Sequence, residues 1–141
     1  MKKGVRYFSQ WSSTFYVAAE LVRRGYLVSL TLGMAPSTDL LVMSPSGKPF
    51  KVEVKSLRKP NYWLIGEVSP QDDLFYVLVF VPEDVLRSPK FCILTSYEVK
   101  GGIENFQKNL LTKGRKISEL DYCIPFNKAF KHENAWNKLP K

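Results

Sequence analysis

The stretch that decides the fold runs from Asp39 to Ser56 and reads DLLVMSPSGKPFKVEVKS. Two runs rich in apolar residues flank the turn sequence SPSGK, and this arrangement is typical of a β-hairpin. Pro45 suits the second position of a type I turn, and Gly47 suits the left-handed residue that follows it. We therefore expect two antiparallel strands, over about residues 39–43 and 50–56.

A three-residue loop sets the register of this hairpin and places Asp39 directly opposite Glu53. Side chains alternate along a strand, so Lys51 and Lys55 share the face of Glu53. Two carboxylates facing each other across strands repel, and a cation between them would remove that repulsion. Carboxylate oxygens are ligands that suit Mg²⁺. The alternative is a surface ladder of salt bridges without a metal, which would contribute little to stability.

The rest of the composition indicates one globular domain with an anionic partner. The chain has 141 residues, 45% of them hydrophobic, and a formal charge of +8. This length is typical of a single domain, and a basic excess favours binding to polyanions. No apolar run approaches the roughly 18 residues of a membrane span. Polar side chains stand where a signal peptide needs an apolar run, at Ser9, Gln10, Ser12 and Ser13. We therefore expect a cytoplasmic protein with no membrane partner.

The cysteines argue against two classes of site, and the placement of the basic residues indicates candidate nucleic-acid contacts. Cys92 and Cys123 stand alone in the sequence, which indicates neither a disulfide framework nor a zinc site. Basic residues dominate both ends of the chain, over residues 1–59 and 100–141, whereas residues 60–99 are acidic. Basic ends can present a positive face to phosphates, although ordinary solvated lysines would give the same count. The candidate nucleic-acid contacts are Arg58, Lys59, Lys113, Arg115, Lys116, Lys128 and Lys131.

Hydrophobic periodicity predicts a mixed α/β sheet flanked by helices. A first helix is expected over residues 12–24, because Ser12, Ser13 and Thr14 offer capping oxygens and Gly25 can end it. Further helices are expected over 96–111, interrupted near Gly101, and over 127–139. The remaining expected strands cover 26–32, 62–68, 74–81 and 91–95. We interpret residues 1–141 as one domain, with a core over about 12–111 and a basic C-terminal extension over about 112–141.

The hairpin resembles the PD-(D/E)XK nuclease superfamily. The resemblance rests on Asp39 at the start of one strand and on Glu53-Val54-Lys55 on the next strand, after an N-terminal helix. The stretch from Ser13 to Asp39 is similar to small bacterial members, including relatives of group I intron homing endonucleases. The resemblance covers about residues 12–96, and it extends to the core of the Holliday junction resolvases.

This resemblance implies a restriction-endonuclease-like αβββαβ core and Mg²⁺-dependent hydrolysis of phosphodiester bonds in duplex or branched DNA, with Mn²⁺ able to substitute. It also implies a homodimer or a higher homo-oligomer. Asp39 and Glu53 would bind the metal, the backbone carbonyl of Val54 would be a further ligand, and Lys55 would be the catalytic lysine. Lys55 would position or deprotonate the attacking water, or stabilise the pentavalent phosphate.

Two features depart from the superfamily pattern. The proline that often precedes the first acid is replaced by Thr38, and no acid stands near the start of the first helix. Glu20 is either a relocated metal ligand or a solvated helix residue. Without a helix acid, a one-metal site becomes more plausible. The alternative function is therefore a catalytically weak or inactive nuclease-fold protein that binds nucleic acid or a protein partner.

Overall fold

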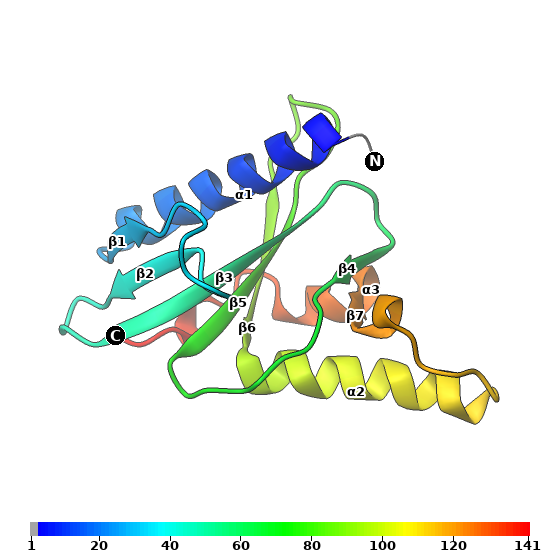
Figure 1. Ribbon diagram of the computed structural model, residues 1–141. Helices are drawn as coiled ribbons and strands as arrows, with labels where there is room; N and C mark the ends of the chain where they lie inside the picture. The colour runs from blue at the N-terminus through cyan, green and yellow to red at the C-terminus, as the bar shows by residue number, and fades with distance from the viewer. Residues whose placement is uncertain (1–2) are drawn as a thin grey trace.

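The computed structural model describes residues 3–141 and contains a five-stranded mixed sheet in the order β1-β2-β3-β5-β6 (Figure 1). Neighbouring strands are antiparallel except β3 and β5, which run parallel. The strands of this sheet are β1 (Leu27–Leu30), β2 (Leu40–Met43), β3 (Pro49–Leu57), β5 (Leu74–Phe80) and β6 (Lys90–Thr95). A second, two-stranded sheet joins β4 (Tyr62–Leu64) to β7 (Cys123–Pro125). The expected mixed α/β class is confirmed.

The hairpin between β2 and β3 has the expected register. Leu40 pairs with Val52 and Met43 pairs with Pro49, and the N–H of Ser44 donates to the carbonyl of Lys48 at 2.8 Å. Gly47 has a φ of 89°, the left-handed conformation that this turn requires. Local turn chemistry thus sets which residues of β3 face each side of the sheet.

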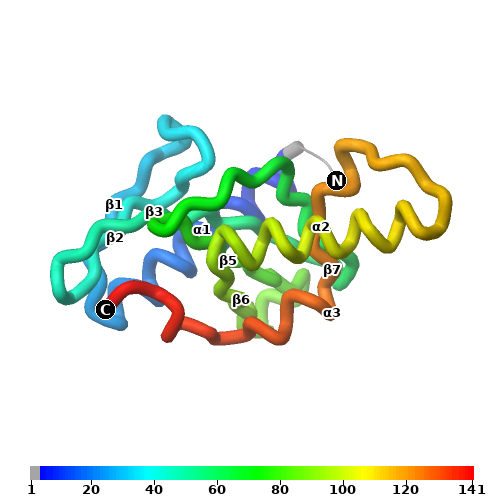
Figure 2. Tube along the Cα trace, turned by 90° about the horizontal axis from the view of Figure 1, so that it is seen from below, coloured from blue at the N-terminus to red at the C-terminus, as the bar shows by residue number. Residues whose placement is uncertain are grey.

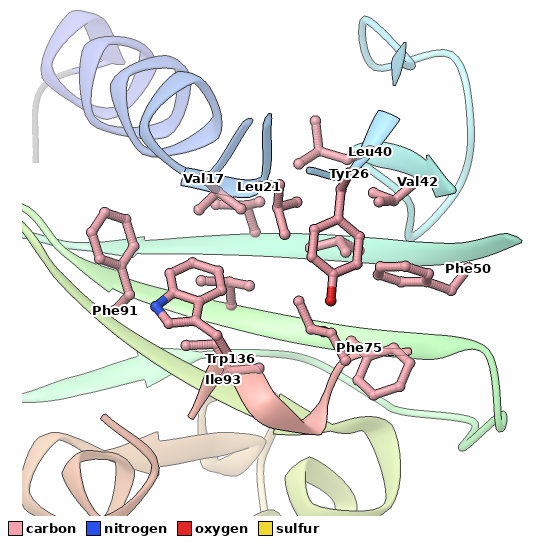
Figure 3. Close-up of a cluster of buried hydrophobic side chains, with 14 of the residues drawn as sticks. Val17, Leu21, Tyr26, Leu40, Val42, Phe50, Phe75, Phe91, Ile93 and Trp136 are labelled. Atoms are coloured by element: carbon pink, nitrogen blue, oxygen red, sulfur yellow. The ribbon is translucent and has the colours of Figure 1, made fainter. Parts of the chain in front are cut away.

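Helix α1 (Lys3–Arg23) covers one face of the sheet. Val17 and Leu21 of α1 are fully buried in this layer, and in Figure 3 they converge on the sheet together with Phe50 and Trp136. The apolar hairpin side chains occupy the same face, as expected: Leu40, Val42, Phe50, Val52 and Val54.

The helix starts well before residue 12, so the expected boundary is wrong. Within α1 the hydroxyls of Ser9 and Thr14 donate to the carbonyls of Val5 and Gln10, both at 3.0 Å. Ser and Thr side chains can cap a helix or bond back to the preceding turn, and here they do the second.

The opposite face is covered by helix α2 (Ser96–Thr112) and by the connection from β3 to β5. Buried side chains of this layer come from the connection, the sheet and α2: Trp63, Ile65, Val68, Leu78, Leu94, Val99 and Ile103. Gly101 does not interrupt α2, whose start carries a capping box formed by Thr95 and Glu98.

The αβββαβ order is not reproduced along the chain. The crossover between the parallel strands β3 and β5 contains β4 and an irregular loop, and α2 follows β6 instead. Pro60, Pro70 and a left-handed Gly66 (φ 88°) oppose a helix in this crossover. Its buried Trp63 packs against the sheet, in the place that a crossover helix would fill.

The expected C-terminal extension is an integral part of the fold. Figure 2 shows the tail running along β6 towards the end of the sheet that holds β1 and β2. Trp136 and Leu139 lie in the core beneath α1, and the hydroxyl of Tyr26 donates to the carbonyl of Pro140 at 2.8 Å.

The helix expected over 127–139 is divided because Asn134 adopts a left-handed φ of 52°. In its place are α3 (Phe126–Ala129) and two 3-10 turns (Phe130–His132 and Trp136–Lys138), after an earlier 3-10 turn (Glu119–Asp121).

Cys92 and Cys123 are buried and free, as the absence of a disulfide pattern suggests. Burial raises the pKa of the Cys92 thiol to about 12 and that of Cys123 to about 11, so both are poor nucleophiles. Among residues 3–141, no helix combines the length and the apolarity needed to cross a lipid bilayer.

The integration of the tail can be measured by replacing two of its leucines. Leu139 is 2% exposed and Leu120 is 63% exposed, so Leu139→Ala leaves a cavity whereas Leu120→Ala does not. We expect Leu139→Ala to lower the free energy of unfolding by about 2–4 kcal/mol and Leu120→Ala by less than about 0.5 kcal/mol, as measured by urea denaturation. Equal, small losses in both variants would contradict a packed tail.

Candidate active site at the fork between β2 and β3

The centre of the candidate site is the backbone of Val54, where β2 and β3 part. Their pairing ends at Leu40 and Val52, although β3 continues to Leu57. At the opened edge the N–H of Val54 donates to Oδ2 of Asp39 at 2.7 Å. The carbonyl of Val54 accepts a hydrogen bond from Nε2 of Gln10 at 3.0 Å. Two side chains from separate elements thus replace a neighbouring strand.

Asp39 lies just before β2, not within it. Its N–H donates to the carbonyl of Val52 at 3.0 Å, and its own carbonyl accepts from the N–H of Thr31 at 3.1 Å. The loop before it contains the left-handed residues Leu32 and Ser37. The expected direct pairing of Asp39 with Glu53 is therefore not formed in the ladder. The backbone turns away at Asp39, and the carboxylate bonds Val54 instead.

The charges of Asp39, Glu53 and Lys55 still influence one another. Burial raises the pKa of Asp39 above its ordinary value of 3.8, and the hydrogen bond from Val54 opposes this. The negative charge of Glu53 raises the pKa of Asp39 further, and the positive charge of Lys55 lowers it. The charges of Asp39, Glu53 and Lys55 therefore interact, although Asp39 and Glu53 do not pair in the ladder.

Glu53 is buried, with 8% of its surface exposed, and it has partners on both sides. Nζ of Lys55 lies 2.7 Å from Oε1 of Glu53. Tyr76 stands beside Glu53 in register on β5 and is itself buried. Burial raises the pKa of the Tyr76 phenol, and Glu53 raises it further through its charge and a hydrogen bond. The phenol thus stays protonated and holds the Glu53 carboxylate.

These contacts argue against the surface salt-bridge ladder. Lys51 turns away from Glu53, since its Nζ lies 3.5 Å from Asp73 and bonds Gln71. Only Lys55 contacts Glu53 among the lysines of this strand. A buried carboxylate is costly unless it is paired, so the Glu53–Lys55 pair differs from the exposed pairs of a ladder.

Glu20 lies near the other end of α1, where it forms ion pairs with Arg23 and Arg24. Within residues 3–141, no three or more His, Cys, Asp or Glu side chains gather in a group that could hold a metal ion. The structure therefore does not bring Glu20 together with Asp39 and Glu53. The structure therefore favours the interpretation of Glu20 as a solvated helix residue over its interpretation as a metal ligand.

Two residues of the site do not emerge from the sequence analysis. Gln10 contacts Val54 from the first helix, and Tyr76 contacts Glu53 from the neighbouring strand β5. A signal existed for Gln10: continuing the buried face of Val17 back along the helix leads to Thr14, which is buried, and then to Gln10. For Tyr76, the hydroxyl within an otherwise apolar strand was the only indication.

The basic candidates do not gather around the fork. Arg58 and Lys59 follow β3 directly. The exposed Lys113, Arg115 and Lys116 lie in the loop after α2, at the opposite side of the molecule from β2 in Figures 1 and 2. Lys128 and Lys131 line a separate hollow of about 350 Å³ beside α2. Only Arg58 and Lys59 are near the strand that carries the site.

The chain matches no family model, no curated protein and no solved structure.

Replacing Asp39 by Asn tests the electrostatic cost of the site. The raised pKa means that the folded protein binds a proton at Asp39 more readily than the unfolded chain does. The wild type should therefore lose stability as the pH rises from about 3.8 through the folded pKa. Asn keeps an oxygen that can accept the Val54 N–H but carries no charge. In thermal unfolding with EDTA, we expect Asp39→Asn to be more stable than wild type at neutral pH, with the gain disappearing in acid.

The matched control is Asp72→Asn. Asp72 is an exposed acid that accepts a hydrogen bond from the Tyr97 hydroxyl at 2.8 Å. Removing the charge of Asp72 makes a basic chain still more basic, so we expect no gain in stability at neutral pH. An Asp39→Asn variant that is less stable than wild type at neutral pH would contradict the electrostatic cost of the charged Asp39.

Proposed function

We propose that the protein is a Mg²⁺-dependent DNA endonuclease with its active site at the fork. The observation that supports this is the cluster of three interacting charged groups at the open edge of β3. The carboxylate of Asp39 accepts from the N–H of Val54, the ammonium of Lys55 pairs with Glu53, and the charges of Glu53 and Lys55 both act on Asp39. Two acids and one cationic side chain at an open strand edge are suited to metal-assisted hydrolysis of a phosphodiester.

The donor set fits Mg²⁺. The raised pKa of Asp39 reflects burial and the nearby charge of Glu53, and a divalent cation would relieve both effects. Mg²⁺ is commonly held by one or two carboxylates together with water and substrate phosphate. Asp39 and Glu53 would supply the carboxylates. The carbonyl of Val54 would join them if the amide of Gln10 turns away from it.

The chain's own residues would then have distinct tasks. When bound, the ion would lower the pKa of a water molecule and polarise the scissile phosphate. The ammonium of Lys55, held 2.7 Å from Glu53, would position the attacking water and offset the negative charge that develops on the phosphate oxygens. Tyr76 would keep the Glu53 carboxylate in place, and Gln10 would fix the edge of β3 from α1.

A second candidate function is nucleic-acid binding without cleavage. Gln10, an amide and not an acid, is the α1 residue that contacts Val54, and no cluster of three acids forms within the described residues. A site with only two carboxylates would hold a metal more weakly. Cleavage assays distinguish the two candidates.

Cleavage of linear, supercoiled and branched DNA in Mg²⁺ tests the proposal with a matched lysine pair. Lys55→Gln removes the ammonium that pairs with Glu53. Lys51→Gln removes an ammonium from the same face of β3, but this one pairs with Asp73. We expect Lys55→Gln and Asp39→Asn to lose at least about 100-fold in rate. Lys51→Gln should stay within about threefold of wild type, as for a surface ion pair.

Full activity in both Lys55→Gln and Asp39→Asn would refute the site assignment. DNA binding without metal-dependent turnover in the wild type would select the non-cleaving alternative. Cleavage of both strands would require two sites, so a homodimer or higher oligomer is part of the proposal, and a solution mass with and without DNA measures it.

Metal binding should also appear as a gain in stability. A ligand that binds the folded state but not the unfolded state raises the free energy of unfolding by about 1.4 kcal/mol when its concentration is roughly ten times its Kd. We therefore expect Mg²⁺ or Mn²⁺ to raise the wild-type Tm by roughly 3–6 °C. Asp39→Asn should lose most of this shift, while Asp72→Asn should keep it. An identical shift in Asp39→Asn would place the metal elsewhere.

A further inference from the structure

Helix α1 carries an exposed row of aromatic side chains, which we call the aromatic stripe: Tyr7, Phe8, Trp11 and Phe15. Tyr7, Phe8 and Phe15 are each more than half exposed. The ring centroids of Trp11 and Phe15 lie 5.5 Å apart, and those of Tyr7 and Trp11 lie 6.4 Å apart. A contiguous exposed apolar patch of this kind usually marks a binding surface.

The stripe lines a hollow of about 700 Å³. Its other wall comes from the loop after β5, residues 81–89, which in Figure 1 lies beside the first turns of α1. Arg58 and Arg87 line the hollow as well, against one acid, Glu83. The hollow thus combines aromatic rings with a net positive charge, since it has two arginines and one acid.

The hollow and the fork share two elements. On α1, Trp11 follows Gln10 directly, and Gln10 donates to the carbonyl of Val54. After β3, Arg58 lines the hollow shortly beyond Lys55, which contacts Glu53. The hollow and the fork are therefore joined through α1 and β3.

We propose that the aromatic stripe holds unpaired bases of the DNA strand whose phosphate is bound at the fork, an inference that rests on the proposed nuclease function. Aromatic side chains stack on bases without strong sequence preference, and arginines add attraction to phosphates and to base faces. The substrate class is thus DNA with a single-stranded segment, such as a branch or a frayed end.

Charge favours this occupant over a second copy of the chain. Between residues 4 and 19 of α1, the only charged side chain is Arg6, which is exposed. Two copies joined face to face through the stripe would bring like charges together at Arg6, Arg58 and Arg87. A phosphate backbone complements the same residues.

Tryptophan fluorescence provides a direct test, because Trp63 and Trp136 are 1% and 9% exposed and Trp11 lies in the stripe. The full chain is titrated in EDTA with single-stranded oligothymidylate and with a blunt duplex of equal length. We expect saturable quenching by the single strand, with affinity at least about tenfold higher than for the duplex.

Ring chemistry separates stacking from general apolar contact. Phe15→Leu keeps an apolar side chain but removes a ring, so the affinity for the single strand should fall about tenfold. Trp11→Phe keeps a ring and should bind within about threefold of wild type by anisotropy of a labelled strand, without the quenching. Tyr97→Leu, which removes an exposed aromatic ring from α2, is the matched control and should bind as wild type.

Three results would each overturn the inference whatever the cleavage assays give. The first is that the single strand fails to quench the fluorescence, and the second is that Phe15→Leu binds the single strand as tightly as wild type. The third is a change in Trp11 emission with protein concentration in the absence of DNA, which would assign the stripe to a second copy. Specific quenching by a single strand in a protein that cuts no DNA would retain the stripe as a binding surface and refute only the nuclease function.

Discussion

The site depends on one constraint, the need to satisfy the backbone of Val54 where β2 leaves β3. An N–H and a carbonyl at an open strand edge must find partners, and here the carboxylate of Asp39 and the amide of Gln10 supply them. Had β2 continued in register, its backbone would have taken both bonds. The bend at Asp39 therefore both ends the strand and brings a carboxylate to the edge of β3, next to Glu53 and Lys55.

The surrounding fold holds this edge in place from both faces of the sheet. On one side, α1 is joined to β3 by Ser13, whose hydroxyl donates to that of Ser56 at 2.9 Å. On the other side, Tyr76 of the buried strand β5 stands beside Glu53. The C-terminal tail adds to the α1 layer through Trp136. Functional groups carried by such packed elements are positioned more accurately than groups on free loops.

The hairpin and its charged residues could be predicted because their geometry is local. The turn from Pro45 to Gly47 sets the register, and the alternation of side chains puts Glu53 and Lys55 on one face. The start of α1 could not be placed as reliably, because Ser and Thr serve equally well as caps or as bonds to the preceding turn. The αβββαβ order failed for a related reason, since the resemblance rests on the hairpin, which says nothing about how β3 is connected to β5.

The sequence by itself determined the mixed α/β class, the hairpin register and the common face of Glu53 and Lys55, because turn chemistry and strand alternation act between residues close in the chain. Tertiary structure decided that Gln10 reaches Val54, that Tyr76 supports Glu53, and that Trp136 packs beneath α1. It also left the aromatic stripe exposed while burying the opposite face of the same helix. Such contacts join residues far apart in the chain, and only the packing of helices against the sheet brings those residues together.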